Sequence, residues 1–146
     1  MQSVRPSGIA RARRARPGER AAALVLADAA RGDLIAGADE AGRGCLAGPL
    51  VAAAVLLAPV RLVGLIEYDD AEQPSPPRMR GGLERLDDSK RVPKQRRRDV
   101  AVAVIEQAIE VAVVVRSAAT VDREGLHRSN LAILGEALDR VNGPVA

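Results

Sequence analysis

Two hydrophobic patterns alternate along the chain, and together they predict a mixture of strands and helices. Short, dense apolar runs cover residues 34–39, 50–57 and 111–115, and each predicts a strand. The 50–57 run contains only Leu, Val and Ala, which is typical of a buried strand. The 111–115 run is rich in β-branched valine, which favours extended backbone.

Helical spacing predicts three further elements. A short Ala-rich helix is expected over 19–31, where Gly32 ends it, and a second helix is expected to begin near Pro93. The third spans about 125–141 and is ended by Asn142-Gly143-Pro144. The second helix has a predicted buried stripe of Val100, Ala101, Val104, Ile105, Ala108 and Ile109. The predicted stripe of the third is Leu126, Ile133, Leu134, Ala137, Leu138 and Val141.

The order of these elements indicates an α/β layer fold, with a long connection in its middle. Residues 58–86 contain four prolines, two adjacent glycines and a group of acids, so we expect most of this connection to be an exposed loop.

Composition limits the class of protein. Apolar residues make up 47% of the 146 positions, but there is no Phe or Trp and only one Tyr, so small side chains must fill the core and we expect marginal stability. A single cysteine excludes an internal disulfide and a Cys-rich zinc site. The longest apolar run, residues 50–60, is far shorter than the roughly 20 residues of a membrane helix, so we expect a cytoplasmic chain without membrane contact.

Positive charge is concentrated at the start of the chain. Residues 1–20 hold six arginines and one glutamate, whereas the other 126 residues hold 16 basic and 18 acidic groups. Residues 1–18 are therefore predicted to be a disordered Arg-rich arm, which either adds phosphate affinity or is a dispensable extension. A second basic cluster lies within residues 90–98.

The chemistry-bearing motif is Asp39-Glu40-Ala41-Gly42-Arg43-Gly44, at the end of a predicted strand. Paired carboxylates suit a hard cation such as Mg²⁺ or Mn²⁺. Because successive residues of a strand point to opposite faces, both acids can reach one site only where the strand ends. Glycines allow such a bend and leave backbone N–H groups open to a ligand. The alternative is an ordinary solvated acid pair.

Several further segments follow this motif in a fixed order. They are Leu46-Ala47-Gly48-Pro49, residues 51–55 (VAAAV), residues 86–90 (LDDSK), Val121-Asp122, Gly125-Leu126-His127 and Ser129-Asn130-Leu131. The ordered set resembles the bacterial ribonuclease HII family over about residues 19–58 and 85–146.

The resemblance implies a fold and an activity. The fold is ribonuclease H-like, a mixed sheet with flanking helices, here incomplete at its C-terminus. The activity is that of an endoribonuclease in DNA replication and repair, which cuts the RNA strand of RNA–DNA hybrids and nicks 5′ of ribonucleotides in duplex DNA. It proceeds by two-metal phosphodiester hydrolysis with Mn²⁺ or Mg²⁺, and the family implies a monomer.

The resemblance also implies roles for single residues. Asp39 and Glu40 become catalytic metal ligands, and the remaining matched residues become nucleic-acid contacts: Gly42, Arg43, Gly44, Ser89, Lys90 and Asn130. Three of them have simpler alternatives: Ser89 could be an ordinary turn residue, Lys90 a solvated cation, and Asn130 a hydrogen-bond partner of a local backbone group. The single histidine, His127, is expected on the surface or in packing.

Two departures from the family pattern lead to further expectations. Residues 59–84 are longer than the usual link, which predicts a loop insertion in an N-terminal catalytic part spanning 19–146. The family needs four carboxylates, and we expect the third directly after residue 146, so the chain alone is predicted to have little nuclease activity. The alternatives are a non-catalytic nucleic-acid-binding remnant and a non-functional fragment.

Overall fold

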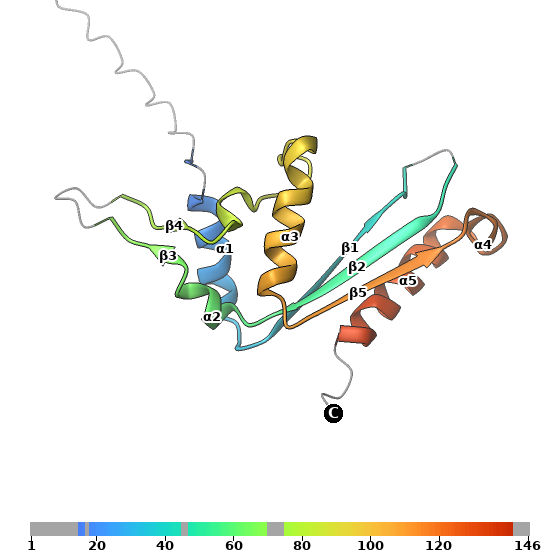
Figure 1. The fold of residues 1–146 in the computed structure, drawn as a ribbon. Helices are drawn as coiled ribbons and strands as arrows, with labels where there is room; N and C mark the ends of the chain where they lie inside the picture. The colour runs from blue at the N-terminus through green and yellow to red at the C-terminus, as the bar shows by residue number, and fades with distance from the viewer. Residues whose placement is uncertain (1–14, 17, 45–46, 70–74, 142–146) are drawn as a thin grey trace, which may run out of the picture.

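A three-stranded antiparallel sheet forms the centre of the structure, a computed structural model that describes residues 15–16, 18–44, 47–69 and 75–141 (Figure 1). Its strands are β1 (Ile35–Ala41), β2 (Leu50–Leu57) and β5 (Glu110–Arg116). β2 lies between the other two and pairs with both in antiparallel register. All three strands coincide closely with the predicted apolar runs, and β2 does so residue for residue.

One face of this sheet is covered by helix α5 (Leu126–Val141), which follows the shorter α4 (Ala118–Glu124). Leu50, Ala52, Ala54 and Leu56 alternate along β2 and are buried on this face, where Ile133, Ala137 and Val141 of α5 join them. Ala52 and Ala54 have no exposed surface, so the small side chains expected from the composition form the contact layer. The α/β class is confirmed, and the sheet with flanking helices is consistent with a ribonuclease H-like fold.

An ion-pair fork also ties α5 to the sheet. The Glu136 carboxylate accepts a hydrogen bond from Arg116, at the end of β5, and another of 2.7 Å from Arg140. The hydrogen bond from Arg116, assisted by that from Arg140, holds the pKa of Glu136 below its usual value.

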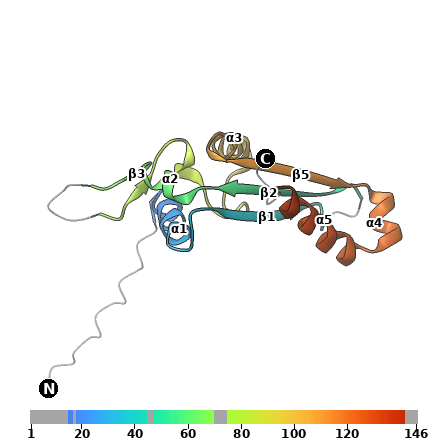
Figure 2. The same cartoon turned by 90° about the horizontal axis from the view of Figure 1, so that it is seen from below.

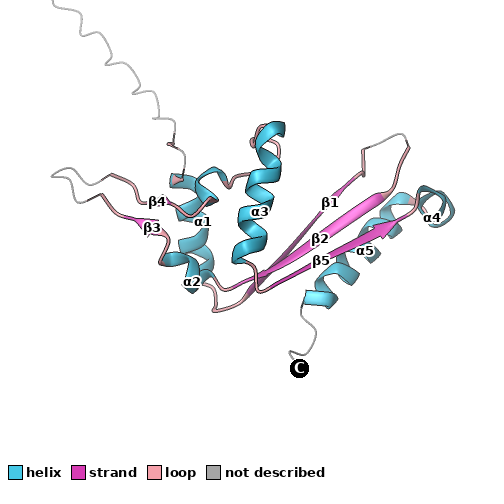
Figure 3. Ribbon diagram, in the orientation of Figure 1, coloured by secondary structure: helices cyan, strands magenta, loops and turns pink. Residues whose placement is uncertain are grey.

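The remaining elements form a second lobe beside the sheet, visible at the opposite end from α4 in Figures 2 and 3. They are α1 (Glu19–Ala29), α2 (Pro59–Val63), β3 (Ile66–Glu67), β4 (Arg78–Met79), α3 (Arg97–Gln107) and the 3₁₀ turns η1 (Leu83–Arg85) and η2 (Lys94–Arg96). This lobe has a core of its own, made of Ala21, Ala22, Val25, Leu62, Ile66, Met79, Leu83 and Ala103.

The expectation of an exposed loop over 58–86 is wrong in part, because α2, β3, β4 and η1 lie within it. Leu62, Ile66, Met79 and Leu83 are all buried, and Ile66 pairs with Met79 across a two-stranded ribbon. Met79 and Leu83 have no apolar residue beside them in the sequence, whereas Leu62 and Ile66 each adjoin one, and all four belong to the core that includes the buried residues of α1. Whether the segment is an insertion relative to the family stays a prediction.

The predicted stripe of α3 is also partly wrong. Val100 is buried, but Ile105 and Ile109 are 57% and 46% exposed, and Ala103 is the other buried residue. α3 contacts the lobe mainly at η1 and η2, so only a narrow strip of its surface is covered. The helix ends at Gln107, and residue 109 already donates its backbone N–H to Leu56 as the chain enters β5.

The helix predicted over 125–141 is confirmed as α5, with one correction to its stripe. Ile133, Ala137 and Val141 are buried and Leu134 and Leu138 partly so, whereas Leu126 is 40% exposed. Gly125, with φ of +84°, separates α5 from α4, which the periodicity missed. The signal for α4 is Ser117, whose hydroxyl accepts from the Thr120 backbone N–H.

Two predictions fall on residues outside the described ranges: most of the 1–18 arm, and the helix end at 142–144. In the part that is described, no helix combines the length and the apolar character that a membrane crossing requires.

The sheet–helix core gives a stability prediction. Ile133 has no exposed surface, so I133A should lower the free energy of unfolding by about 2–5 kcal/mol in urea denaturation. Leu131, on the same helix, is 59% exposed, and L131A should change it by less than about 0.5 kcal/mol. Equal effects of the two variants would contradict the described orientation of α5.

Candidate active site at the end of β1

Asp39 and Glu40 lie near the end of β1 but on opposite faces of the sheet. Glu40 pairs with Ala52 and so shares the face that α5 covers, and its side chain is 17% exposed. Asp39 pairs with Ala53 on the uncovered face and is exposed. The two acids were expected to share a site only if the strand ended at them. β1 continues to Ala41, so this condition is not met.

The two carboxylates have different partners. An oxygen of Asp39 accepts a 2.9 Å hydrogen bond from the Glu40 backbone N–H. The guanidinium of Arg43 folds back from the following turn and lies 3.6 Å from a carboxylate oxygen of Glu40. Arg43 is 58% exposed, so it can also present its charge to a ligand.

The turn after β1 requires glycine at one position and leaves a second glycine open. Gly42 has φ of +98°, and a Cβ atom there would lie 2.4 Å from the carbonyl oxygen of Pro49. At Gly44 a Cβ atom would meet nothing within 4 Å, so its backbone is accessible. The tight turn expected from the Gly-Arg-Gly motif is therefore present at Gly42, and the contact of these backbone groups with a ligand stays a prediction.

Ser89 and Lys90 are exposed in a turn of the other lobe. Two neighbouring acids, which the sequence analysis left without a role, shape this turn. An Asp88 side-chain oxygen accepts from the Lys90 backbone N–H at 2.8 Å, and an Asp87 oxygen accepts from the Asp88 N–H at 2.9 Å. Such side-chain bonds to the following backbone fix turn geometry. Their signal in the sequence was the Asp-Asp-Ser order itself.

Asp87 also anchors the turn to the start of α1. Arg20 donates a 2.8 Å hydrogen bond to its carboxylate, and the guanidinium of Arg91 lies 3.7 Å away. The hydrogen bond from Arg20, followed by that from the Asp88 N–H, lowers the pKa of Asp87 below 3.8. The residue therefore stays ionised through the whole neutral range.

Asn130 is buried on α5 with only 5% of its surface exposed. Its side-chain oxygen has no hydrogen-bond partner among the described residues, and neither has the hydroxyl of Ser129 beside it. This oxygen therefore accepts no hydrogen bond from a local backbone N–H group, which was the alternative given for Asn130. A nucleic-acid contact by Asn130 stays a prediction. His127 is exposed, as expected of a surface residue.

The structure thus gathers five predicted site residues, from Asp39 to Gly44, at one end of β1, while Ser89 and Lys90 come from the second lobe. In Figure 1 that end of β1 and the beginning of α3 lie on the same side of the molecule. Within the described ranges, no group of three or more His, Cys, Asp or Glu residues could hold a metal ion. Of the residues gathered at this end of β1, Asp39 and Glu40 are the ones whose side chains offer the hard oxygen donors that Mg²⁺ and Mn²⁺ prefer.

Comparison with known proteins decides the family. The family model of ribonuclease HII matches residues 36–141, which include both acids, the glycine turn, the Ser89–Lys90 turn and α5. The chain belongs to the ribonuclease HII family. This is a family of hydrolases that act on phosphodiester bonds and generally depend on divalent metals, and the resemblance seen in the sequence is confirmed.

Individual ribonuclease HII relatives agree with this assignment. The chain is 44% identical to ribonuclease HII of Salinispora tropica over 110 residues, which are 75% of this chain and 34% of that protein. It is 43% identical to that of Salinispora arenicola over 71% of this chain and 32% of the relative. It is 42% identical to that of Frankia casuarinae over 74% of this chain and 38% of the relative. The chain therefore spans about a third of the length of the curated relatives it matches.

The glycine turn gives a second prediction. G42A forces a residue with a Cβ atom into the left-handed region and against the Pro49 carbonyl, so it should lower the free energy of unfolding by about 1–3 kcal/mol. G44A, where the added atom meets nothing, should stay within about 0.5 kcal/mol of the wild type. Chemical denaturation measures both values, and a G42A variant as stable as G44A would contradict the described turn.

The Asp87 anchor predicts a pH dependence. Because its folded pKa lies below the 3.8 of the free side chain, its contribution to stability is present above pH 3.8 and is lost as pH falls through the folded pKa. D87N should therefore be less stable than the wild type at neutral pH, and the difference should shrink as the pH falls below 3.8. Urea denaturation across this range is the measurement. D139N, at an exposed acid without a described ion pair, is the control and should show no such trend.

Proposed function

We propose that the chain carries one part of the active site of a metal-dependent endoribonuclease. The substrates are the RNA strand of RNA–DNA hybrids and single ribonucleotides embedded in duplex DNA, which are cut on their 5′ side by phosphodiester hydrolysis. The observation that carries the proposal is the juxtaposition of Asp39 and Glu40 with a turn that only glycine at position 42 permits.

The turn supports the choice of a ribonucleotide. Only the 2′-hydroxyl distinguishes RNA from DNA at a given position, and backbone groups that approach the sugar closely can read it. Gly44 leaves its backbone uncovered for such a contact, and the exposed guanidinium of Arg43 can hold the adjacent phosphate. Ser89, Lys90 and Asn130 remain proposed contacts to the nucleic-acid backbone.

The acids support the metal requirement. Asp39 and Glu40 are the carboxylates that would hold Mn²⁺ or Mg²⁺, and because they lie on opposite faces of β1 they do not share one ion in the described arrangement. Bound metal would supply charge neutralisation at the reacting phosphate and activation of water. Asp39 is exposed and orders its neighbour's backbone through one of its two oxygens. Glu40 has its charge partly balanced by Arg43. We further propose that the protein acts as a monomer in the cytoplasm.

A chimera tests the proposal. Residues 36–141 would replace the corresponding segment of the Salinispora tropica ribonuclease HII, to which this chain is 44% identical. With Mn²⁺, the chimera should nick a duplex that contains one ribonucleotide, as seen on a denaturing gel. D39N in the chimera should reduce the rate by at least about 100-fold, because it removes a carboxylate from the reacting centre.

Two controls sharpen this experiment. An all-DNA duplex should stay intact, and D139N in the chimera should leave the rate unchanged. The 146-residue chain alone should show little or no nicking, since its described residues hold no cluster of three acids. A folded chimera without activity would refute the proposed function. Clear nicking by the chain alone that disappears in D39N would refute the claim that the two acids are insufficient.

A further inference from the structure

A cleft lined by arginines lies in the second lobe, apart from the end of β1. It has a volume of about 730 Å³, within the range of ligand-binding sites. Its walls come from the start of α1, from η1 and from residues 86–93. Four arginines line it, namely Arg16, Arg20, Arg85 and Arg91, together with the acids Glu84 and Asp87. We refer to it as the arginine cleft.

The charges in the arginine cleft are only partly balanced. Asp87 accepts from Arg20 at 2.8 Å and lies 3.7 Å from Arg91, so one carboxylate serves two guanidiniums. Within the described residues, Arg16 and Arg85 have no carboxylate within ion-pair distance, and both are exposed. Four arginines and two acids line the cleft, and the Glu19 carboxylate, which accepts a 2.9 Å hydrogen bond from the Arg16 backbone N–H, lies beside them, so the arginines still outnumber the nearby acids. An anion is therefore the complementary ligand.

The backbone around the arginine cleft is fixed by packing and hydrogen bonds. The Gly18 carbonyl accepts from the Met79 backbone N–H at 3.1 Å, which joins the start of α1 to β4. Gly18 itself has φ of +87°, and a Cβ atom there would lie 3.0 Å from the Met79 carbonyl oxygen. On the opposite wall, Arg97 donates to the Val92 carbonyl at 3.1 Å. The arginines thus extend from supported segments, which reduces the entropy lost on binding.

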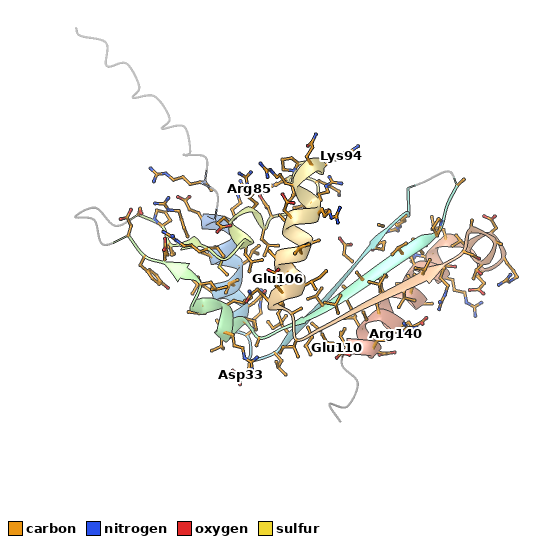
Figure 4. The ribbon with its side chains drawn as sticks, viewed as in Figure 1. Asp33, Arg85, Lys94, Glu106, Glu110 and Arg140 are labelled. Carbon is orange, nitrogen blue, oxygen red and sulfur yellow. The ribbon has the colours of Figure 1, made fainter. Side chains whose placement is uncertain are left out.

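The position of the cleft indicates the source of the anion. The exposed Ser89–Lys90 turn lies between Asp87 and Arg91, and both of these residues line the cleft. Figure 4 places Arg85 and Lys94 at the upper end of the lobe, the side toward which the Asp39 end of β1 also points. A row of positive groups on one side of the molecule suits a ligand with repeated phosphates, whereas a small anion would occupy only one position.

We propose that the arginine cleft binds a backbone phosphate of the nucleic-acid duplex, with Arg16 and Arg85 as the contacting residues. This inference rests on the proposed function, because it assigns a second point of attachment for the same substrate. The planar guanidinium forks suit phosphodiester oxygens, and Asp87 holds Arg20 and Arg91 in place beside them. Contacts of this kind position a duplex without reading its sequence.

Duplex binding in EDTA tests the inference without requiring catalysis. Fluorescence anisotropy would compare the wild-type chain with R16A/R85A, using a labelled duplex that contains one ribonucleotide. At low salt the variant should bind about tenfold or more weakly, and its slope of log affinity against log salt should be shallower by about 2, one unit for each lost contact. The single variant R85E, which replaces a positive charge by a negative one at an exposed position, should also weaken duplex binding.

The control variant is R31A/R61A, which removes the same charge from exposed positions outside the cleft. It should bind within about twofold of the wild type, because a general effect of net charge is small beside two lost contacts. Equal losses in the two double variants would overturn the proposal. A wild-type chain that binds no duplex would also overturn the proposal. This holds even if inorganic phosphate raises the melting temperature of that chain.

The outcome can be separated from that of the proposed function. D139N should bind the duplex in EDTA as the wild type does, because Asp139 lies on α5 and does not line the arginine cleft. Loss of nicking in the chimera with intact duplex binding would count against the proposed function alone. An R16A/R85A variant that binds normally would count against the arginine cleft alone.

Discussion

The packing of α5 against the alanine face of β2 is the contact on which the site depends. Ala52 and Ala54 are fully buried, and their small side chains let the helix lie directly over the centre of the sheet. Because the register between β1 and β2 is fixed, Glu40 comes to lie at the end of this same face, opposite Ala52. The side chain is therefore held at the edge of a packed layer, where a carboxylate can stay partly solvated.

Local signals in the sequence were sufficient for the sheet and for the glycine turn. β2 is an unbroken apolar run, and Gly42 follows two acids at a strand end, so periodicity and residue type alone located both. The β3–β4 ribbon was missed because Met79 is a single apolar residue and a polar, proline-rich stretch separates it from Ile66. Their burial comes from packing against α1, which only the three-dimensional structure reveals.

The candidate site was also predicted only in part, because residue type is visible in the sequence but the placement of side chains is not. Asp39 and Glu40 could be identified as candidates from their types, but their placement on opposite faces depends on β1 continuing through Ala41. The role of Asp87 could not be inferred, because its main partner, Arg20, is 67 positions away in the sequence. Long-range hydrogen bonds of this kind leave no periodic pattern.

The existence of two separate cores has a mechanical consequence. Each lobe buries its own apolar residues, and the chain crosses between the lobes three times, from α1 to β1, from β2 to α2 and from α3 to β5. Leu57 of β2 packs against the core of the second lobe, and the backbone N–H of Ile109 donates to the Leu56 carbonyl. The placement of the acids of β1 relative to the basic turn of the other lobe thus depends on these connections. A ligand that contacts both lobes at once restricts their motion relative to each other. The arrangement of the site residues is then fixed by the bound molecule as much as by contacts within the protein.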